Sequence, residues 1–461
     1  MIPHDPARRF HDAADFGFSP DADGTENAEA LQRAVDLGGT VTISRPGVYS
    51  LARTVTIGSD TALVFGAGVS VRKVADAGLF TQVFLNKGAL TRTWDRNISI
   101  HGLNLIVNGV DQAVGDIYGL RGQVGFFYIR DLSITRFRCL DLGATQFAIH
   151  VCTFEDIIID DVMVTGDKDG VHLGPGTRFT IRNGVFKTLD DAVALNGHDY
   201  ASGSPELGWI ENGVVENCHD LADDKDPIGF FCRILAGGWT DWQEGMEVQN
   251  SDSVISKGRI YRVQAKPDGT FYQSVTRPTH ESGSQVLDGI NWGMVQETIT
   301  YTAGVRNVTF RDIFLEKPRV AFSIHFDDGR YSRSYYPGAE VPRQEQIHLD
   351  GIHVMHPEPV DFLSIDTPVD AVNVTNSRIL ENRIRFHKRD ISIDHQVTQV
   401  NMTGCVFAHD GEMELVRNEI AGKEIRLKTT ASIELHDRFS ATVDSGQGNI
   451  KTVSDLTGLT T

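Results

Sequence analysis

The segment Ile181-Arg182-Asn183-Gly184-Val185-Phe186 carries a short pattern that recurs along the chain. An apolar residue is followed by polar and turn-forming residues, and apolar alternation then resumes. Alternation of period two predicts strands, and the Asn, Asp or Gly in the middle predicts a tight bend between them. The same pattern begins at Ile100, Ile129, Ile159, Ile210, Phe310, Leu349, Val374 and Met402.

The spacing of these copies indicates how the strands are arranged. Most copies begin 22 to 39 residues apart, and a single interval is 100 residues long. One such coil cannot bury its own apolar face, but stacked coils can, because each strand hydrogen-bonds to its copy about 4.8 Å away. We therefore expect an all-β fold, a right-handed parallel β-helix (solenoid). A β-sandwich is the structural alternative, but the hairpin turn signals that it requires are few.

The expected organisation is a single parallel β-helix domain over residues 1–461. An N-terminal cap and first coil occupy about 15–72, and the repeating coils occupy about 97–410. The long interval predicts an insert at about 236–300. Residues of about 410–461 lose the repeat and are expected to form a C-terminal cap and tail.

Residues 25–36 predict an amphipathic helix that caps the first coil. Thr25 is the expected N-cap, and Gly38-Gly39 ends the helix. The apolar face consists of Ala28, Leu31, Ala34 and Val35. A cap of this kind covers strand edges that would otherwise pair with other chains.

Composition excludes several classes of protein. The chain has 43 Lys and Arg against 62 Asp and Glu, a formal net charge of −19, which argues against a nucleic-acid partner. No apolar run approaches the ~20 residues that span a bilayer. Residues 1–5 lack the features of a secretory signal, so we expect a cytoplasmic protein, or a secreted one if a signal peptide has been removed. The five scattered cysteines form no Cys-x-x-Cys pair, which predicts buried thiols.

The densest cluster of acids lies between residues 166 and 199. Asp169 and Asp190 are 21 residues apart, close to the local coil length of 22, so neighbouring coils should bring them onto the same side of the solenoid. Asp191 needs a bend or bulge to join them, because consecutive strand residues face opposite sides. Crowded carboxylates raise the pKa of one acid, which can then protonate a leaving oxygen while the others activate water. This is the chemistry of a glycosidase.

Residues 15–72 resemble the N-terminal cap and first coil of the pectate-lyase-like superfamily. The resemblance rests on Asp15-Phe16-Gly17-Phe18, Asp23-Gly24-Thr25, Gly39-Thr40-Val41 and Gly47-Val48-Tyr49. It describes a shape and identifies no particular reaction.

Residues of about 150–240 resemble the polygalacturonase family of glycoside hydrolases. In that family an Asn-Thr-Asp-Gly stretch is followed about one coil later by Asp-Asp, and then by Gly-His-Gly and Arg-Ile-Lys. Asp167-Lys168-Asp169-Gly170 matches the first motif in its last two residues, and Asp190-Asp191-Ala192-Val193-Ala194 matches the second well. Arg233-Ile234-Leu235 resembles the fourth.

The resemblance implies a role for each matched residue. Asp190 would be the general acid, Asp169 and Asp191 would hold the nucleophilic water, and Arg233 would bind substrate. The implied reaction inverts the anomeric centre and uses neither a cofactor nor a metal. Inverting enzymes need roughly 6.5–9.5 Å between acid and base to admit the water.

The chain departs from the family pattern in two places. No Gly-His-Gly follows Asp191, and His198 is the nearest histidine that could replace it, with His172 as another candidate and His219 as a weaker one. Leu235 stands where the family has a lysine that pairs with the substrate's carboxylate. This replacement favours a neutral or differently substituted sugar over polygalacturonate.

Further substrate-binding residues are expected around this cluster. Asp167 and Lys168 flank Asp169, and Trp239 and Trp242 of the insert could form a platform on which a sugar stacks. A second polar cluster comprises residues 325–330, followed by Arg333, Tyr335 and Tyr336; it is either a solvated loop or a wall of the substrate site.

The sequence therefore predicts a carbohydrate-active enzyme that hydrolyses glycosidic bonds in a poly- or oligosaccharide. One alternative is a polysaccharide lyase or fructotransferase-like enzyme, because Lys168 could act as a base beside a Ca²⁺ ion. Another is a non-catalytic carbohydrate-binding solenoid, which the concentration of acids disfavours. The sugar, the linkage, endo or exo action and the oligomeric state stay open.

Overall fold

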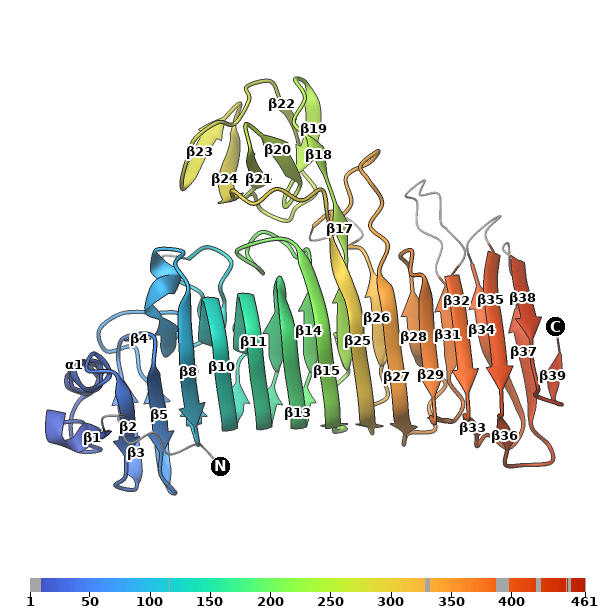
Figure 1. Ribbon diagram of the computed structural model, residues 1–461, viewed down its shortest axis with the longest axis horizontal. Coiled ribbons are helices and arrows are strands. Elements are labelled where there is room, and N and C mark those ends of the chain that lie inside the picture. The colour runs from blue at the N-terminus through green and yellow to red at the C-terminus, as the bar shows by residue number, and fades with distance from the viewer. Residues whose placement is uncertain are drawn as a thin grey trace.

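The computed structural model describes residues 10–115, 117–327, 332–386, 398–419, 424–444, 446 and 449–460. Within these ranges the chain forms a stack of coils whose strands make one long parallel sheet system (Figure 1). The all-β parallel solenoid predicted from the repeat is confirmed. Among the described helices, none is long and apolar enough to cross a membrane.

The first line of parallel strands runs along the whole stack, each strand pairing with the next. It consists of β1 (Phe10–Asp12), β2 (Gly39–Ile43), β5 (Thr61–Phe65), β8 (Asp95–His101), β10 (Gly122–Leu142), β11 (Phe147–Gly166), β13 (Gly176–Thr188), β15 (Trp209–Asp220), β25 (Thr302–Leu315), β27 (Glu345–Val354), β29 (Ala371–Thr375), β32 (Thr398–Thr403), β35 (Glu424–Thr430) and β38 (Asn449–Val453).

A second line carries the candidate site, and β10 and β11 are long enough to belong to both lines. Its other members are β4 (Val55–Ile57), β7 (Phe84–Asn86), β12 (Val171–Leu173), β14 (Val193–Asn196), β16 (Cys232–Leu235), β26 (Phe322–His325), β28 (Asp361–Ile365), β31 (Arg383–Phe386), β34 (Glu412–Asn418), β37 (Ser440–Asp444) and β39 (Leu459–Thr460). Shorter strands complete the coils: β3 (Gly47–Leu51), β6 (Val69–Lys73), β9 (Asn104–Ile106), β30 (Arg378–Ile379), β33 (Val406–Phe407) and β36 (Ile433–Glu434).

The predicted bends are confirmed at every copy of the repeat. The third residue of each copy has a positive φ, between 51° and 77°. These residues are Gly102, Asp131, Asp161, Asn183, Asn212, Asp312, Gly351, Asn376 and Gly404. Asn, Asp and Gly tolerate this left-handed conformation better than other residues, which is why the bends recur with this chemistry.

The register corrects two of the predicted copies. Ile159 pairs with Ile134 on one side and with Ile181 on the other, and Ile181 pairs with Val215. The copies that begin at Ile129 and Ile210 therefore belong to a different bend of the coil. Coils contain more than one left-handed bend of the same chemistry, and the local pattern cannot tell the bends apart.

One apolar core runs through the stack. Equivalent positions on consecutive coils fill it, as Ile100, Ile134, Ile159 and Ile181 do, each at most 1% exposed. All five cysteines are buried and unpaired, as the sequence predicts. Stacked apolar ladders of this kind bury the face that a single coil leaves open.

Helix α1 (Gly24–Val35) lies at the N-terminal end of the stack (Figure 1). Its buried residues belong to the main core. The expected N-cap at Thr25 is wrong by two residues, because the side chain of Asp23 accepts from the backbone of Thr25 and Glu26, and Glu26 reaches back to Asp23. The 3₁₀ turns η1 (Ala13–Phe16) and η2 (Lys87–Leu90) complete the helical part of the described chain.

The interval of 100 residues is one coil that carries an insert, because β15 pairs directly with β25. After β17 (Gly237–Gly238), which pairs antiparallel with β25, the insert rises above the coils as two small sheets (Figure 1). Its strands are β18 (Thr240–Asp241), β19 (Met246–Gln249), β20 (Ser253–Ser256), β21 (Arg259–Val263), β22 (Phe271–Ser274), β23 (Ser284–Leu287) and β24 (Ile290–Gln296). The insert has an apolar core of its own, which contains Trp242 and Trp292.

Candidate active site

The coil-to-coil register brings the three predicted acids together. Pairing of Val171 in β12 with Val193 in β14 places Asp169 and Asp191 at equivalent positions two residues earlier. Carboxylate oxygens of Asp169, Asp190 and Asp191 lie within 4.8 Å of one another. All three residues line a cavity of about 800 Å³, so the predicted clustering on one side of the solenoid is confirmed.

The three acids differ in their access to this cavity. Asp169 and Asp191 are only 3% and 1% exposed, whereas the side chain of Asp190 is 16% exposed. Asp191 also accepts a hydrogen bond of 2.9 Å from the backbone N–H of Phe230 on the next coil. A substrate in the cavity therefore meets Asp190 more readily than the other two.

Lys168 is the cation closest to the cluster. Its ammonium group donates to Asp190 and lies 3.9 Å from Asp169. Burial lowers the pKa of Lys168, but the charges of Asp169 and Asp190 outweigh burial and raise the pKa above its usual value. The amine therefore stays protonated at neutral pH.

The environment pushes the pKa values of the three carboxyl groups apart. Burial raises the pKa of Asp190, and the charge of Asp169 raises it further. Burial and the charges of Asp190 and Asp169 raise the pKa of Asp191 well above its usual value. For Asp169, burial acts in the same direction, but Lys168 and His172 outweigh it and lower the pKa. Such divergence separates a proton donor from a proton acceptor within one cluster.

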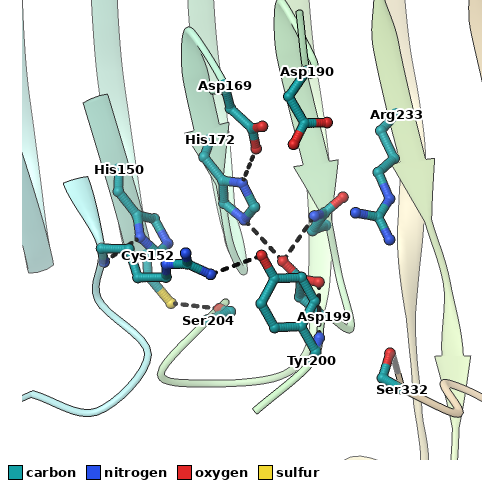
Figure 2. Close-up of polar contacts among 12 residues, drawn as sticks. His150, Cys152, Asp169, His172, Asp190, Asp199, Tyr200, Ser204, Arg233 and Ser332 are labelled. Carbon is teal, nitrogen blue, oxygen red and sulfur yellow. Dashed lines mark hydrogen bonds and ion pairs between the residues drawn. The ribbon is translucent and has the colours of Figure 1, made fainter. Parts of the chain in front are cut away.

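A buried histidine joins Asp169 to a fourth carboxylate (Figure 2). His172 Nδ1 lies 2.8 Å from Asp169 Oδ2, and His172 Nε2 lies 3.3 Å from Asp199 Oδ2. Asp199 also accepts hydrogen bonds from the side chain of Asn196 at 3.0 Å and from the backbone N–H of Tyr200 at 2.8 Å. Sequence reasoning named His172 as a candidate but did not select Asp199.

Arg233 lies across the cavity from the histidine, on β16 (Figure 2). Its guanidinium donates to Asp327 at 2.5 Å. Burial lowers the pKa of Arg233, but the charges of Asp327, Asp199 and Asp191 raise it well above its usual value. The predicted placement of Arg233 beside the cluster is confirmed, although its role in binding substrate stays a prediction.

The remaining walls of the cavity come from several separate parts of the chain. Arg121 on one wall donates to the hydroxyl of Tyr200 at 2.8 Å. His325 and Asp327 come from the second polar cluster, of which Asp328, Gly329 and Arg330 lie outside the described residues. The other lining residues are Tyr118, Ser202, Ile228, Phe230 and, from the insert, Asn250, Ala265 and Pro267.

Four of the expected substrate-binding residues are not among the residues that line this cavity. Trp239 and Trp242 are 1% and 6% exposed, because they pack into the cores that support the insert. His198 is 1% exposed against the ring of Trp239, and burial lowers its pKa to about 3. Asp167 is partly exposed and forms an ion pair with Lys225 at 2.6 Å. The expected sugar platform in the insert is therefore wrong.

The structure also places His219 and Leu235. His219 stacks on Phe314 at 4.5 Å and is not among the residues that line the cavity. Leu235 lies on the same face of β16 as Arg233 and pairs with the cavity residue His325, but it is fully buried. The expectation of a neutral or differently substituted sugar stays a prediction.

Sequence reasoning missed Asp199, Arg121 and Tyr200, whereas Asp327 belongs to the polar cluster of residues 325–330 that the sequence predicts to be either a solvated loop or a wall of the substrate site. Asp199 and Tyr200 follow the strand that begins after Asp191, and their position one short strand beyond the acidic motif was the available signal. Arg121 and Asp327 are 48 or more residues away from the motif on either side of Asp169 and reach the cavity through coil stacking.

Comparison with known proteins supports the resemblance found in the sequence. No protein-family model matches the chain. A polygalacturonase from Penicillium janthinellum is 27% identical in a match that covers 26% of this chain and 41% of the relative. The match thus spans less than half the length of that relative. It confirms the predicted resemblance to the polygalacturonase family.

Solved structures similar to this chain include three carbohydrate-active proteins. An exopolygalacturonase from Thermotoga maritima has a TM-score of 0.44 and 11% identity, with 95% of this chain and 92% of that chain covered. An endo-xylogalacturonan hydrolase from Aspergillus tubingensis has a TM-score of 0.45 and 10% identity, and the match covers 98% of this chain and 100% of that chain. The A-module of a mannuronan C-5 epimerase from Azotobacter vinelandii has a TM-score of 0.48 and 11% identity, with 97% and 99% covered. This likeness does not identify a reaction.

Proposed function

We propose that this protein is a glycoside hydrolase that cleaves a poly- or oligosaccharide by an inverting mechanism. The observation that carries the proposal is the cluster of Asp169, Asp190 and Asp191 at one cavity, with pKa values shifted in opposite directions. Glycoside hydrolysis needs both a carboxylic acid and a carboxylate at the scissile bond. The similarity to a polygalacturonase agrees with this chemistry.

Asp190 is the general acid in this proposal. Its side chain is the most exposed of the three, and its raised pKa keeps a proton available for the leaving oxygen. Lys168 opposes that protonation, because it forms an ion pair with the Asp190 carboxylate. A substrate oxygen that enters between Lys168 and Asp190 would take the place of this ion pair.

Asp169 and Asp191 hold the attacking water. Their oxygens lie within 4.8 Å of those of Asp190, which is shorter than the ~6.5–9.5 Å of most inverting pairs and nearer to the ~5–5.5 Å of retaining pairs. Burial nevertheless favours inversion, because a carboxylate that is 1% or 3% exposed can bind a water molecule but offers little surface to a sugar ring. A covalent glycosyl-enzyme intermediate would need a carboxylate that reaches the anomeric carbon.

The lyase alternative is less favoured by the geometry. A lyase base must accept a proton, whereas Lys168 is paired with Asp190 and its pKa is raised. The three clustered carboxylates could also bind a divalent cation, which a lyase would use to neutralise a uronate. Chelation with EDTA and detection of unsaturated products distinguish this alternative from hydrolysis.

The test is a screen of plant and bacterial oligosaccharides, read by product chromatography with wild type and Asp190→Asn in parallel. We expect new reducing ends with wild type only, and inverted anomeric configuration in the first product by proton NMR. Turnover by Asp190→Asn, or unsaturated products that disappear with EDTA, would overturn the proposal. If the first product keeps the anomeric configuration of the substrate, the protein can still be a hydrolase, but the inverting mechanism is overturned.

A further inference from the structure

One row of equivalent positions holds two residues that line the cavity. His150, His172, Ala194, Arg233 and Ser323 pair in register on five consecutive coils. Ala194 separates the two members of this row that line the cavity, His172 and Arg233. The carboxylate of Asp199 lies between these two side chains, next to the His172 ring (Figure 2). The charge of Asp199 also raises the pKa of Arg233.

His172 is held between two carboxylates in one orientation. Nδ1 lies 2.8 Å from Asp169 and Nε2 lies 3.3 Å from Asp199, so both ring nitrogens face an acceptor. The ring stacks on Phe147 at 4.0 Å with an interplanar angle of 8°, and the residue is 1% exposed. An imidazole in this place can satisfy both carboxylates only when it carries two protons.

Asp199 is equally constrained. It is fully buried, and its oxygens accept from Asn196 and from the backbone N–H of Tyr200. A buried carboxylate needs a nearby cation, and His172 on one side and Arg233 on the other supply positive charge. Asp199 therefore stays ionised and stabilises the protonated form of His172.

We propose that His172 and Asp199 are positioning residues that keep Asp169 ionised and oriented towards the attacking water until Asp169 takes a proton from that water. The inference rests on the proposed hydrolase function. In this arrangement the two protons of His172 stay on the ring during the cycle. Two protons move within the cluster: Asp190 gives its proton to the leaving oxygen as the glycosidic bond breaks, and Asp169 takes a proton from the water whose oxygen bonds to the anomeric carbon. Proton exchange with solvent then returns Asp190 to the acid and Asp169 to the carboxylate.

A merely structural role for His172 predicts different behaviour. A packing role would lower stability when His172 is changed but leave the pH dependence of hydrolysis unaltered. The positioning role predicts a change in that pH dependence. Lys168 and His172 both oppose the effect of burial on Asp169, so loss of His172 removes one of them and shifts the pKa of Asp169 upward. The charged or titratable groups that act on Asp169, His172 or Asp199 from the packed elements include Lys168, His150, Arg233, Asp190, His198, Tyr200, Arg262 and Asp327.

The kinetic test compares His172→Gln, Asp199→Asn and the double variant with the control His150→Gln. His150 packs against His172 at 4.7 Å but is not among the residues that line the cavity. We expect kcat to fall about 10–100-fold in each site variant with KM within about twofold, and the acidic limb of the pH profile to move to higher pH. The double variant should lose little more than either single variant, because the two residues act as one unit.

A second measurement does not depend on hydrolysis. Carbon-13 labelling of histidine allows the ring of His172 to be followed by NMR in the full-length protein. We expect a doubly protonated ring at pH 7, because the interactions with Asp169 and Asp199 outweigh burial and raise the pKa of His172. Asp199→Asn should lower that pKa.

The two measurements separate the inference from the function on which it rests. A neutral His172 ring at pH 7, or variants that change only the melting temperature, would overturn the positioning role. If no saccharide is cleaved by wild type while His172 is doubly protonated and responds to Asp199→Asn, the charged contact of His172 with Asp169 and Asp199 stands and the hydrolase proposal fails.

Discussion

Acids lie in rows on two faces of the coils, and their ionisation differs between the faces. We call the face near the left-handed bends, with Asp156, Asp160 and Asp161, the bend face, and the face with Asp169, Asp190 and Asp191 the cavity face. On the bend face, Asp156, Asp160 and Asp161 of β11 each pair with an arginine of a neighbouring coil, at 2.6, 2.9 and 2.6 Å. The pKa values of Asp156 and Asp160 are lowered: the hydrogen bond from Arg178 does so for Asp156, and for Asp160 arginine and asparagine partners outweigh burial. These acids behave as ordinary surface ion pairs.

On the cavity face, five carboxylates line a site with three Lys and Arg side chains. Asp169 and Asp191 are nearly inaccessible there, and their pKa values move in opposite directions. Stacking of coils brings acids together on both faces. The difference shows that burial and a shortage of cations, rather than proximity alone, turn a row of acids into a set of distinct proton donors and acceptors.

The largest effect is expected for Asp169→Asn. An amide at this position cannot accept the proton of the attacking water, so kcat/KM should fall by about 10³-fold or more, equivalent to about 4 kcal/mol of transition-state stabilisation. Steady-state kinetics on the saccharide found by the screen would measure it. A variant that keeps more than about a tenth of the activity would show that Asp169 is not the base.

Arg233→Met should cause the largest loss of stability. It leaves Asp327 and Asp199 buried without a cation that acts on both, which typically costs about 3 kcal/mol. Urea unfolding would measure the change. Arg182→Met on the bend face is the matched control, since it removes an exposed ion pair with Asp160 worth about 0–1 kcal/mol. Equal losses in both variants would contradict the distinction between the two faces.

Asp191→Asn should raise stability at neutral pH. The pKa of Asp191 is raised in the folded state, so folded protein binds more protons than unfolded protein once pH exceeds the unfolded pKa of about 3.9, and wild-type stability falls as pH rises to the folded pKa. Asn has no titratable carboxyl group, so the variant does not lose stability in this way as the pH rises. Urea midpoints should therefore be higher for the variant at pH 7 and converge with wild type below about pH 4. A lower midpoint at pH 7 would show that ionised Asp191 is well compensated.

The smallest effect is expected for Asp160→Asn on the bend face. The change removes a partly exposed ion pair with Arg182 but keeps the side-chain shape, so stability should change by no more than about 0.5 kcal/mol. Hydrolysis should stay within about twofold of wild type in the same assays. A large loss of activity would mean that the bend face takes part in binding substrate.

Much of the fold could be predicted because its rules are local. Period-two alternation identifies the strands, and Asp161 or Asn183 in a left-handed bend is visible in the sequence itself. The coil length of 22 residues was enough to place Asp169 and Asp190 on neighbouring coils. Register was less predictable, and the copies beginning at Ile129 and Ile210 were misplaced because two bends share one pattern.

The site was predictable only where its residues lie within that local repeat. From the sequence, Trp239 and Trp242 fit either a sugar-binding platform or a hydrophobic core. In the structure they are buried in the hydrophobic cores of the insert and its base. His198 and Asp199 are neighbours in sequence, yet one packs against Trp239 and the other enters the cavity. Which of two adjacent side chains lines the cavity depends on residues from distant parts of the chain, such as Trp239, that pack against the other one.

The amino-acid order by itself determined a ribbon of short strands with bends at regular intervals, because strand period and bend chemistry involve only near neighbours. Three-dimensional packing alone decided that Arg121, Asp199 and Tyr200 meet around the acids, since those contacts depend on register between coils and on the paths of the loops. It also decided the charge of each carboxyl group, because burial and distant partners, not identity, set whether an aspartate keeps its proton.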